Sequence, residues 1–552
     1  MRILRASDTA LLVEAADLAE AMRLNLSWTD VAGVRELIPG ARTVLVRFDP
    51  AQISAGELAA DLRAAPVQEA LSAHSRQVSI AVHYDGQDLT EVAEILGVAA
   101  ETVIARHLAV PWQVAFSGFA PGFGYAVSSD PLFDVPRRSS PRTKVPAGSV
   151  GLAGPFTGIY PRESPGGWQL IGRTDERLWD LDREPPALLA PGTEVTFQRA
   201  PRPVANLSAT THTTTHDADR TASGVPAPEG DAAAPSPSNI QDGPYGAAGE
   251  LRVTQSGVQT LVQDLGRPGH AALGVCASGT ADRIALRAAN RAVGNAPGEP
   301  VLECVGAVSL AYAGPPTIMA VMGAEGEVAL HAADGVEHAV STGAAFAVED
   351  GDHITMQYPS AGLRYLVAVR GGIAAPRALN SSASDTLAGL GPAALHTGDR
   401  IPVGDPGDAP NVVELSGGQR HLPQPGESVE LAITLGPRDD WFTAAAVQTL
   451  LEQDWEVTQR SDRVGLRLAG ETPLERALDG ELPSEGAVTG AIQVPPDGQP
   501  VLFLPDHPLT GGYPIIGAVT DDHLDLAGQL PPGTRIRFYR DERAERIEGE
   551  QL

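Results

Sequence analysis

Three neighbouring segments decide the fold of this chain: Ser117-Gly-Phe-Ala-Pro-Gly-Phe-Gly-Tyr125, Ser140-Pro-Arg-Thr-Lys-Val-Pro-Ala-Gly-Ser149 and Ser164-Pro-Gly-Gly-Trp-Gln-Leu-Ile-Gly172. They are dense in glycine, proline and aromatic residues and contain few apolar runs long enough for a helix. Glycine permits left-handed and close-approach backbone, whereas proline fixes φ and removes a hydrogen-bond donor. Such a chain is costly to order, so we expect its shape to serve a binding site. The middle segment also holds Lys144, the single lysine of the sequence.

Length and composition indicate a multidomain protein rich in strands and turns. A chain of 552 residues can form roughly three or four domains. The formal net charge of −29 argues against nucleic acid or an anionic membrane surface as a partner, because both would repel it. The first residues lack the apolar core of a signal peptide, and no apolar run reaches membrane length. We therefore expect a cytoplasmic protein.

The two cysteines, Cys276 and Cys304, are too few for a disulfide framework and do not form a zinc pattern. Both lie among small or apolar residues, which predicts buried free thiols.

The first 76 residues run in short alternating elements. Their apolar periodicity predicts, in chain order, a strand at 10–14, a helix at 18–24, strands at 34–38 and 43–48, a helix at 55–65 and a strand at 77–83. The order β-α-β-β-α-β is typical of a ferredoxin-like lobe. We predict such a lobe over residues 1–76, with its last strand at the boundary.

Residues 77–200 are predicted to form a second unit. Two helices, at 88–96 and 100–109, precede a region at 112–197 in which short strands alternate with Gly/Pro turns. This pattern is typical of a small β-barrel.

Residues 201–248 mark a boundary between two bodies. The segment Ala209-Thr-Thr-His-Thr-Thr-Thr-His216 is polar and of low complexity, and the residues after it are rich in Pro and Ala. Such a composition cannot bury enough apolar surface to offset the entropy of ordering, so we predict a disordered linker. No Cys or carboxylate cluster accompanies His212 and His216, and we predict no metal site here.

The second body is predicted over residues 249–545. It opens with the turn Val262-Gln-Asp-Leu-Gly-Arg-Pro-Gly-His270, which carries Asp264 and Arg267. Residues 278–290 are predicted to form a capped helix with Asp282 in its first turn. Alternating segments at 317–322, 344–348 and 365–369 predict strands of an all-β barrel.

A weak internal repeat relates the two bodies. Val145-Pro-Ala-Gly-Ser-Val150 resembles Leu482-Pro-Ser-Glu-Gly-Ala-Val488, and Gly166-Gly-Trp-Gln-Leu-Ile-Gly172 resembles Gly511-Gly-Tyr-Pro-Ile-Ile-Gly517. Two matches in the same order predict related barrels that place similar loops at a shared cleft.

Arginines and carboxylates gather in the turns of both bodies. Arginine forks suit carboxylate or phosphate groups, and lysine supplies a compact charge. The candidate groups are Arg142 with Lys144, Asp264 with Arg267, Arg438 with Asp440, Asp462 with Arg463, and Glu485 with Gln493 and Asp506. Taken singly, each could be an ion pair that stabilises a turn. His107 and His507 are candidate acid/base groups, although structural histidines are commoner.

The motifs of the first body resemble a known family. Gly118-Phe-Ala-Pro-Gly-Phe-Gly-Tyr125, Pro136-Arg-Arg-Ser-Ser-Pro-Arg-Thr-Lys-Val-Pro-Ala-Gly-Ser-Val150 and Thr157-Gly-Ile-Tyr-Pro161 are similar to the signature of the KipI family. This family contains the B component of 5-oxoprolinase and is also termed allophanate hydrolase subunit 1. The resemblance implies a ferredoxin-like lobe with a cyclophilin-like barrel.

The second body resembles the KipA family, which contains the C component of 5-oxoprolinase and is also termed allophanate hydrolase subunit 2. The similarity lies in residues 262–269, 278–279, 289–295, 461–465, 482–486, 491–500 and 510–514. A similar pair forms the carboxyltransferase region of biotin-dependent urea carboxylases. The chain thus resembles a natural fusion of the B and C components. The implied fold is β-rich α+β, with cyclophilin-like barrels meeting at a cleft.

The resemblance implies ATP-dependent opening of 5-oxo-L-proline to L-glutamate, together with a separate A component of the LamB/YcsF type. ATP and Mg²⁺ are the implied cofactors, and the lactam or an amide is the implied substrate. Phosphorylation of a lactam oxygen creates a leaving group, and Arg and Lys charges would stabilise the phosphate. A homo-oligomer is a further possibility that the sequence leaves open.

Residue type and position give the site prediction. The catalytic candidates are Arg142, Lys144, Asp264, Glu485 and Asp506. The candidates for substrate or nucleotide binding are Ser149, Tyr160, Gly166, Gly167, Trp168, Arg267, Ser278, Gln493, Thr510 and Tyr513.

The sequence also departs from the family patterns. Ala120 and Gly124 stand where the KipI pattern has Thr and Pro, and Ser382 stands where the KipA pattern has Arg. The KipA segment Asp-Arg-Gln-Thr-Thr reads here Asp506-His-Pro-Leu-Thr510. Because unmatched polar groups discriminate strongly between substrates, these changes leave the substrate open.

Two further functions remain open. The chain could be the carboxyltransferase component of a biotin-dependent urea or amide carboxylase. It lacks an Ala-Met-Lys-Met biotin-acceptor motif, so the biotin carrier would be another chain. Alternatively, it could be a non-catalytic binding protein, like the kinase inhibitor after which KipI is named.

Overall fold

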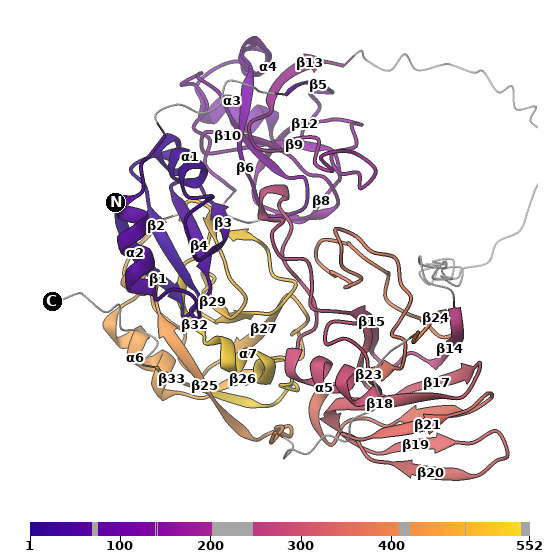
Figure 1. The fold of residues 1–552 in the computed structure, drawn as a ribbon. Coiled ribbons are helices and arrows are strands. Elements are labelled where there is room, and N and C mark those ends of the chain that lie inside the picture. Colours follow the sequence, from indigo (N-terminus) through magenta and orange to yellow (C-terminus); the bar gives the residue numbers. More distant parts are fainter. Residues whose placement is uncertain are drawn as a thin grey trace, which may run out of the picture.

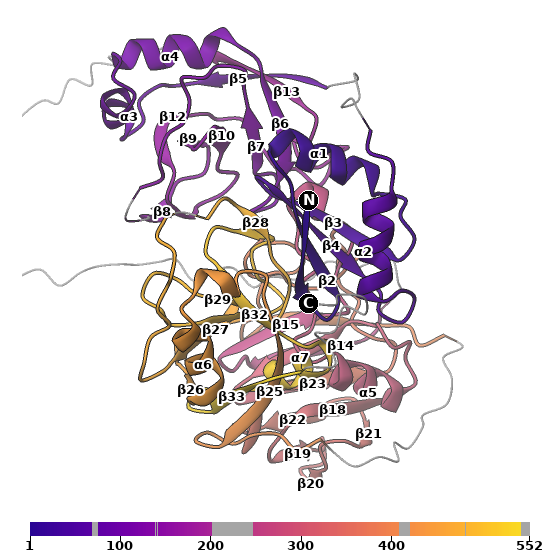
Figure 2. The same ribbon diagram turned by 90° about the vertical axis from the view of Figure 1, so that its left-hand side faces the viewer.

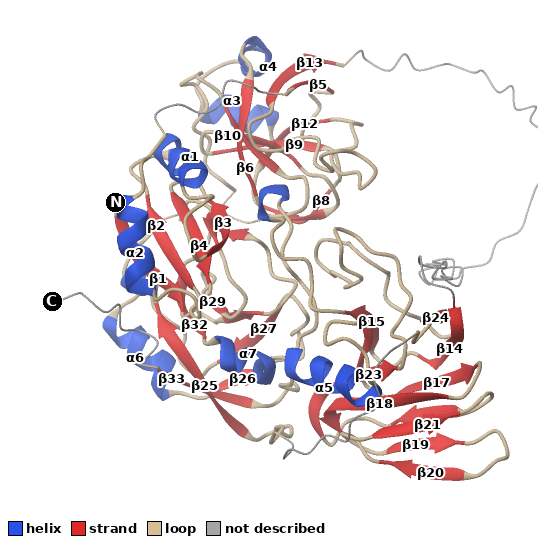
Figure 3. Ribbon diagram, viewed as in Figure 1, coloured by secondary structure: helices blue, strands red, loops and turns tan. Residues whose placement is uncertain are grey.

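The structure is a computed structural model and describes residues 1–68, 76–138, 140, 142–200, 247–407, 420–480 and 482–541. Nearly all of the expected linker (201–248) lies outside these residues. Strands dominate over helices (Figure 3), and closed or nearly closed barrels are present. The predicted β-rich class with barrels is confirmed. In the described part of the chain, no helix combines the length and apolar character that crossing a bilayer requires.

The N-terminal lobe is an antiparallel four-stranded sheet with two helices. Its strand order is β1 (Arg2–Ser7), β2 (Ala10–Glu14), β4 (Thr43–Phe48) and β3 (Val34–Pro39), with helices α1 (Leu18–Ser27) and α2 (Ala55–Ala64). Both helices begin at the residues where the sequence predicts. The reason is local: Asp17 accepts a hydrogen bond from the backbone of Glu20, and Ser54 forms a reciprocal capping box with Glu57.

The predicted β-α-β-β-α-β strand order is wrong in one respect. The strand expected at 77–83 is β5 (Gln77–Val82), and it does not join the lobe but pairs in parallel with β13 (Glu194–Arg199) of the barrel. Its place in the lobe is taken by β1, which the sequence did not predict. A tight turn at Asp8 and Thr9 lets β1 form a hairpin with β2, so a local partner completes the sheet.

The lobe's sheet is buried on both faces. Leu11 and Val13 point into a core shared with α1, α2 and the first barrel. The intervening residues Ala10 and Leu12, with Leu45, point into another core formed with the C-terminal barrel. Because successive side chains of a strand point to opposite faces, one apolar run serves both cores. The lobe therefore links the first half of the chain to the far end of the second (Figures 1 and 2).

The first barrel is a seven-stranded sheet with helices α3 (Leu89–Ile95) and α4 (Ala100–Ala109). A bridge between His83 and Arg173 joins its two edges, so the sheet nearly closes. The strand order is β12 (Gln169–Arg173), β9 (Ser149–Ala153), β10 (Phe156–Ile159), β7 (Gly124–Val127), β6 (Trp112–Ser117), β13 and β5, and a separate ribbon pairs β8 (Arg142–Val145) with β11 (Ser164–Gly166).

The second half begins with two sheets that share one core. One sheet contains β20 (Glu337–Val340), β19 (Val328–His331), β22 (His353–Met356), β17 (Val308–Ala313), β14 (Ala247–Gln255) and β24 (Arg400–Gly404). The other contains β15 (Gln259–Gln263), β16 (Val301–Val305), β23 (Ala361–Val369), β18 (Thr317–Glu325) and β21 (Ala345–Val348). Helix α5 (Arg283–Val293) packs on β18 and β23, and its N-cap is Asp282. Cys276 and Cys304 are buried and free, as predicted.

The chain then forms a closed barrel with helices α6 (Ala444–Glu452) and α7 (Asp521–Ala527). Around the barrel run β25 (Ser428–Leu435), β32 (Ile515–Val519), β29 (Ala491–Gln493), β30 (Val501–Phe503), β27 (Gly465–Ala469), β26 (Trp455–Val457) and β33 (Arg535–Arg540). A short ribbon pairs β28 (Glu485–Gly486) with β31 (Thr510–Gly511).

The two barrels follow one plan, which confirms the predicted internal repeat. In each, the first strand pairs in parallel with the last: β5 with β13 and β25 with β33. In each, the strand that follows a helix begins with a tryptophan whose Nε1–H donates to a backbone carbonyl five residues earlier in the chain. Trp112 donates to His107 and Trp455 donates to Leu450, both at 3.0 Å. The two ribbons, β8–β11 and β28–β31, contain parts of the repeated motifs.

The core that the lobe shares with the C-terminal barrel predicts that the two halves stay associated when the chain between them is cut. In a full-length variant with a protease site inserted within residues 201–246, the cleaved fragments should co-elute on size-exclusion chromatography. Leu45→Asp would bury an unpaired carboxylate in this core at a large cost in free energy, and should separate them. Arg63→Asp, on the exposed face of α2, should not. Separation of the cleaved wild-type fragments would contradict the shared core.

Candidate functional site

A pocket of about 460 Å³ lies where the two halves meet, a volume that suits a small molecule. We call it the junction pocket. The first half contributes aromatic side chains and the ribbon glycines, and the second contributes the corresponding ribbon and nearby turns. The principal lining residues are Phe119, Phe123, Tyr125, Arg137, Arg138, Tyr160, Gly166, Gly167, Trp168, Arg476, Ser484, Gln493, Pro508, Thr510, Gly511, Gly512 and Tyr513.

Close backbone approaches shape the pocket. A Cβ added at Gly118 would lie 2.4 Å from Oγ1 of Thr510, and one added at Gly166 would lie 2.3 Å from the hydroxyl oxygen of Tyr160. The backbone N–H of Phe119, which has a φ of 64°, donates to Thr510 Oγ1 at 3.1 Å. Only glycine fits at positions 118 and 166, which explains why the organising segments of the sequence are so rich in it.

Two arginines, one from each half, bring uncompensated charge to the junction pocket. Arg137 donates to Ser484 Oγ at 2.8 Å across the interface. Arg476 donates to the carbonyl of Val494 at 2.7 Å, and its guanidinium lies 5.9 Å from the centre of the Tyr513 ring. Burial lowers the pKa of Arg476, and Tyr513 opposes this. Within the described residues, the partners of these two arginines are the Ser484 hydroxyl, the Val494 carbonyl and the Tyr513 ring, and none of them is acidic.

Arg138 differs from these two, because it pairs with Asp88 at 3.0 Å and with Glu91 at 3.5 Å. Among the described residues, the lining of the junction pocket holds no acidic side chain. The pocket therefore combines an aromatic wall with positive charge. This combination fits a ligand with a flat or apolar body and a carboxylate or phosphate group.

Seven of the residues predicted from the sequence line this pocket. They are Tyr160, Gly166, Gly167 and Trp168 from the first half, and Gln493, Thr510 and Tyr513 from the second. Burial raises the pKa of Tyr160, so its hydroxyl stays protonated and can donate a hydrogen bond. The repeated Gly-Gly-aromatic motifs thus face one another across the pocket.

Four other predicted residues meet in a buried polar network inside the second half. Asp264 accepts hydrogen bonds from Ser381 Oγ and the backbone of Ser382, both at 2.7 Å. Ser278 Oγ donates to Asp506 at 2.6 Å. Arg267 donates to the backbone carbonyls of Ala378 and Ala383. None of the four lines the junction pocket, although the chain leads from Asp506 directly to Pro508 in its wall.

Asp506 is the charged centre of this network. Burial opposes its ionisation, but the charge and hydrogen bonds of Arg463 outweigh burial and hold the pKa of Asp506 below its usual value. Arg463 forms two hydrogen bonds to Asp506, at 3.0 and 3.1 Å, and also pairs with Glu303. The predicted pairing of Asp462 with Arg463 is wrong, because the guanidinium points inward to Asp506 and Glu303.

Asp385, which the sequence did not indicate, adjoins this network. Its Oδ1 accepts a hydrogen bond from the backbone of Ala388 at 2.7 Å, while its buried Oδ2 has no partner among the described residues. Burial, together with the charge of Asp506, raises the pKa of Asp385 to about 7.

The remaining predicted residues lie outside the junction pocket. Lys144 is exposed and pairs with Glu163 at 3.0 Å. Arg142 pairs with Asp88 at 2.6 Å. The two residues of the candidate group Arg142 with Lys144 thus belong to two separate ion pairs, one with Asp88 and one with Glu163. Ser149 is buried at the start of β9. Glu485 pairs with Arg438, which also binds Glu14, while Asp440 pairs with Arg2; the predicted Arg438–Asp440 pair is therefore absent. The functional roles of these residues stay predictions.

The two candidate histidines are buried and hold contacts within the fold. Burial lowers the pKa of His107 to about 3, and its ring contacts Tyr84 Oη and Thr157 Oγ1. Burial lowers the pKa of His507 to about 4, and its ring stacks on Phe503. Sequence reasoning missed Arg137 and Arg476. Arg137 lies within one of the family-like motifs, whereas nothing in the sequence distinguishes Arg476 from other surface arginines.

The predicted cofactors can be compared with this lining. The arginines fit the phosphates of a nucleotide, but magnesium takes oxygen ligands, mostly carboxylates and water. Within the described residues, no group of three or more His, Cys, Asp or Glu side chains is placed to hold a metal ion. We therefore assign no magnesium ligand to this chain.

Family models match both halves. Residues 1–189 match the model described as carboxyltransferase domain, subdomain C and D, and residues 273–540 match the model described as carboxyltransferase domain, subdomain A and B.

Curated relatives and a solved structure agree with this division. The chain is 33% identical to the C component of 5-oxoprolinase from Escherichia coli K12 over 52% of this chain and 91% of that protein. It is 42% identical to the B component of 5-oxoprolinase from E. coli O157:H7 over 32% of this chain and 82% of that protein. Urea amidolyase of Lachancea kluyveri is 30% identical over 52% of this chain, but only 17% of that protein is covered. The crystal structure of TTHA0988 superposes with a TM-score of 0.77 at 31% identity, covering 96% of this chain and 99% of that one.

The raised pKa of Asp385 predicts a pH dependence of stability. Between the ordinary carboxyl pKa near 4 and the folded value of about 7, the unfolded chain releases this proton while the folded chain keeps it. Asp385 therefore lowers the free energy of unfolding progressively as pH rises through this window. Above the window its contribution no longer changes with pH. The gain in melting temperature of Asp385→Asn over wild type should grow from pH 4 to pH 7 and then level off. A pH-independent gain, or the same profile in the control Asp61→Asn on exposed α2, would contradict this assignment.

Proposed function

The chain belongs to the carboxyltransferase-domain family that includes the B and C components of 5-oxoprolinase, and from this premise we propose that it is the fused B–C component of an ATP-dependent 5-oxoprolinase. In this proposal it opens 5-oxo-L-proline to L-glutamate together with an A component of the LamB/YcsF type. A cytoplasmic location belongs to the same proposal.

One observation carries the proposal: Arg137 from the first half and Arg476 from the second lie in one pocket without acidic partners among the described residues. The substrate carries one carboxylate, and phosphoryl transfer from ATP places a second negatively charged group on its lactam oxygen. Two guanidinium groups in one pocket, contributed by different halves, suit these two anionic positions. Since each wall belongs to a different half, the core that the lobe shares with the C-terminal barrel keeps the site assembled.

The rest of the lining supports the same chemistry. Phe119, Phe123 and Trp168 provide an apolar wall that excludes water. In such surroundings the electrostatic effect of an arginine on a developing charge is stronger than in water. Tyr160, protonated because of its burial, and Gln493 supply hydrogen-bond donors that would orient the lactam amide. ATP supplies the phosphoryl group, and residues of the partner would hold its magnesium.

The test is ADP release by the purified chain with 5-oxoproline, with and without the LamB/YcsF-type partner. We expect turnover only with the partner. Arg137→Ala and Arg476→Ala should each lower kcat/KM by about tenfold to a hundredfold, because each removes a charge-assisted hydrogen bond. Arg476→Lys should recover part of the loss.

Lys144→Ala distinguishes the junction pocket from the site predicted by sequence alone. If the pocket is the site, this variant should retain near-wild-type turnover, since Lys144 is exposed and paired with Glu163. Loss of turnover in Lys144→Ala, with Arg137→Ala and Arg476→Ala unaffected, would overturn the proposed location.

A carboxyltransferase is the second candidate, because both family models carry that description. The same arginines would then orient a carboxylated carrier. This function predicts transfer of carboxylate from free carboxybiotin to urea or another amide without ADP release, and a positive result would replace the first proposal.

A further inference from the structure

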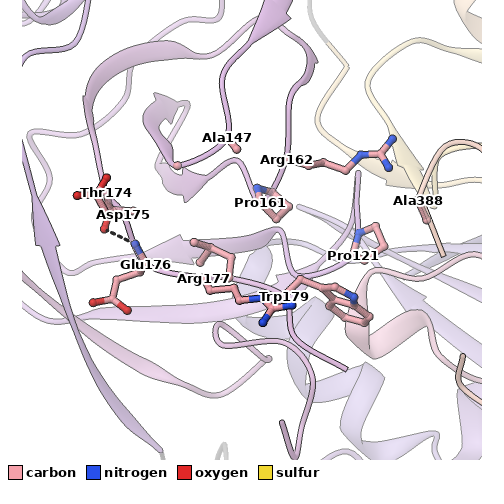
Figure 4. Close-up of a pocket in the computed structure, with 12 residues that line it drawn as sticks. Pro121, Ala147, Pro161, Arg162, Thr174, Asp175, Glu176, Arg177, Trp179 and Ala388 are labelled. Carbon is pink, nitrogen blue, oxygen red and sulfur yellow. Dashed lines mark hydrogen bonds between the residues drawn. The ribbon is translucent and has the colours of Figure 1, made fainter. Parts of the chain in front are cut away.

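A second pocket, of about 440 Å³, lies on the other side of the loops that wall the junction pocket. Phe119 and Phe123 line the junction pocket, whereas Pro121 between them lines the second pocket. Likewise Tyr160 faces the first, and Pro161 and Arg162 face the second. We call it the Arg162 pocket (Figure 4).

Glycine contacts hold the walls of the Arg162 pocket in place. A Cβ at Gly122 would lie 3.1 Å from the carbonyl oxygen of Leu178 and 3.4 Å from the Trp179 side chain, so this turn packs directly on the pocket floor. Gly148, with a φ of +77°, brings its Cα against the Thr174 carbonyl, where a Cβ would lie at 2.2 Å. Pro121, Leu178 and Trp179 give the pocket an apolar surface beside its polar lining, as in ligand sites generally.

Arg162 is the basic side chain of this pocket that forms no salt bridge with the described residues. Figure 4 shows it extending from the first half toward the loop that carries Ala388 of the second half. Gly389 makes room for it, because a Cβ there would lie 2.8 Å from Nη1. Arg162 is half-buried, and its guanidinium makes no hydrogen bond or ion pair within the described parts of the chain. Burial lowers its pKa, and the charge of Asp385 opposes this.

The other charged groups leave Arg162 incompletely neutralised. Asp385 holds its proton up to about neutral pH, because burial and Asp506 raise its pKa to about 7. Arg177 is exposed and pairs with Asp180 at 3.1 Å. Asp175 and Glu176 are exposed, and Figure 4 shows them on the opposite side of the pocket from Arg162. Arg162 is therefore the charged group at the end of the pocket near Ala388 that is available to an anion.

We propose that the Arg162 pocket is a second anion-binding site, in which the guanidinium of Arg162 holds the phosphate or carboxylate group of a small molecule whose body rests on Pro121, Leu178 and Trp179. A half-buried guanidinium has lost part of its hydration, and an anion restores the missing hydrogen bonds. The site is separate from the junction pocket and does not depend on the function proposed for it.

The experiment is isothermal titration of the full chain with inorganic phosphate in one arm and succinate in the other, which distinguishes the two anion sources. Saturable binding with a component of one equivalent that requires Arg162 is expected in at least one arm. Arg162→Ala should weaken it about tenfold or more, and Arg162→Lys should weaken it less. Arg177→Ala, which changes an exposed arginine of the same pocket that pairs with Asp180, and Arg199→Ala, which changes an exposed arginine outside both pockets, should leave the affinity unchanged.

A second variant covers the case in which Arg162→Ala fails to fold. Ala388→Glu places a carboxylate at the Arg162 end of the pocket and should abolish anion binding without changing the melting temperature greatly. The proposal is overturned if neither anion binds saturably to the wild type. It is also overturned if the affinity is insensitive to both Arg162→Ala and Ala388→Glu, or falls equally in Arg199→Ala.

Discussion

The double burial of the N-terminal sheet is the constraint on which the rest of the structure depends. Leu12 and Leu45 pack on the C-terminal barrel, and Leu11 and Val13 pack on the lobe's own helices and the first barrel. Each fully buried leucine contributes roughly 1.5–3 kcal/mol. The sheet thereby fixes the position of one barrel relative to the other. The junction pocket requires this, because its arginines come from opposite halves.

The pocket shows how a repeated fold produces an asymmetric site. Both barrels present a ribbon that ends in Gly-Gly-aromatic, so Trp168 and Tyr513 face the same cavity. The flanking residues differ: aromatic side chains dominate on the first half, and polar residues with Arg476 on the second. Similar backbones thus supply two different walls: the first half adds most of the apolar surface, and each half adds an arginine that suits an anionic group.

Short-range sequence patterns predicted many of the secondary-structure elements and turns. Capped helices such as 55–64, the glycine turns and the internal repeat depend on neighbouring residues, and all are present. Contacts between residues that are distant in the sequence could not be predicted in this way. Strand β5 joined the barrel because β13, more than a hundred residues later, offered a parallel partner. Arg463 points to Asp506 and Glu303 instead of its sequence neighbour Asp462, and Lys144 stays at the surface with Glu163. Lys144 was predicted as a site residue because it is the single lysine of the sequence. Arg137 and Arg476 differ from other arginines in their burial and in their hydrogen-bond partners, which depend on the fold.

The central claim is that one ligand contacts both halves at the junction pocket. Hydrogen–deuterium exchange of the full chain, with and without saturating 5-oxoproline, tests it most directly. The account predicts slower exchange at residues 164–168 of the first half and 510–513 of the second, with the same dependence on ligand concentration. Protection confined to one of these segments, or found only elsewhere, would contradict a shared site.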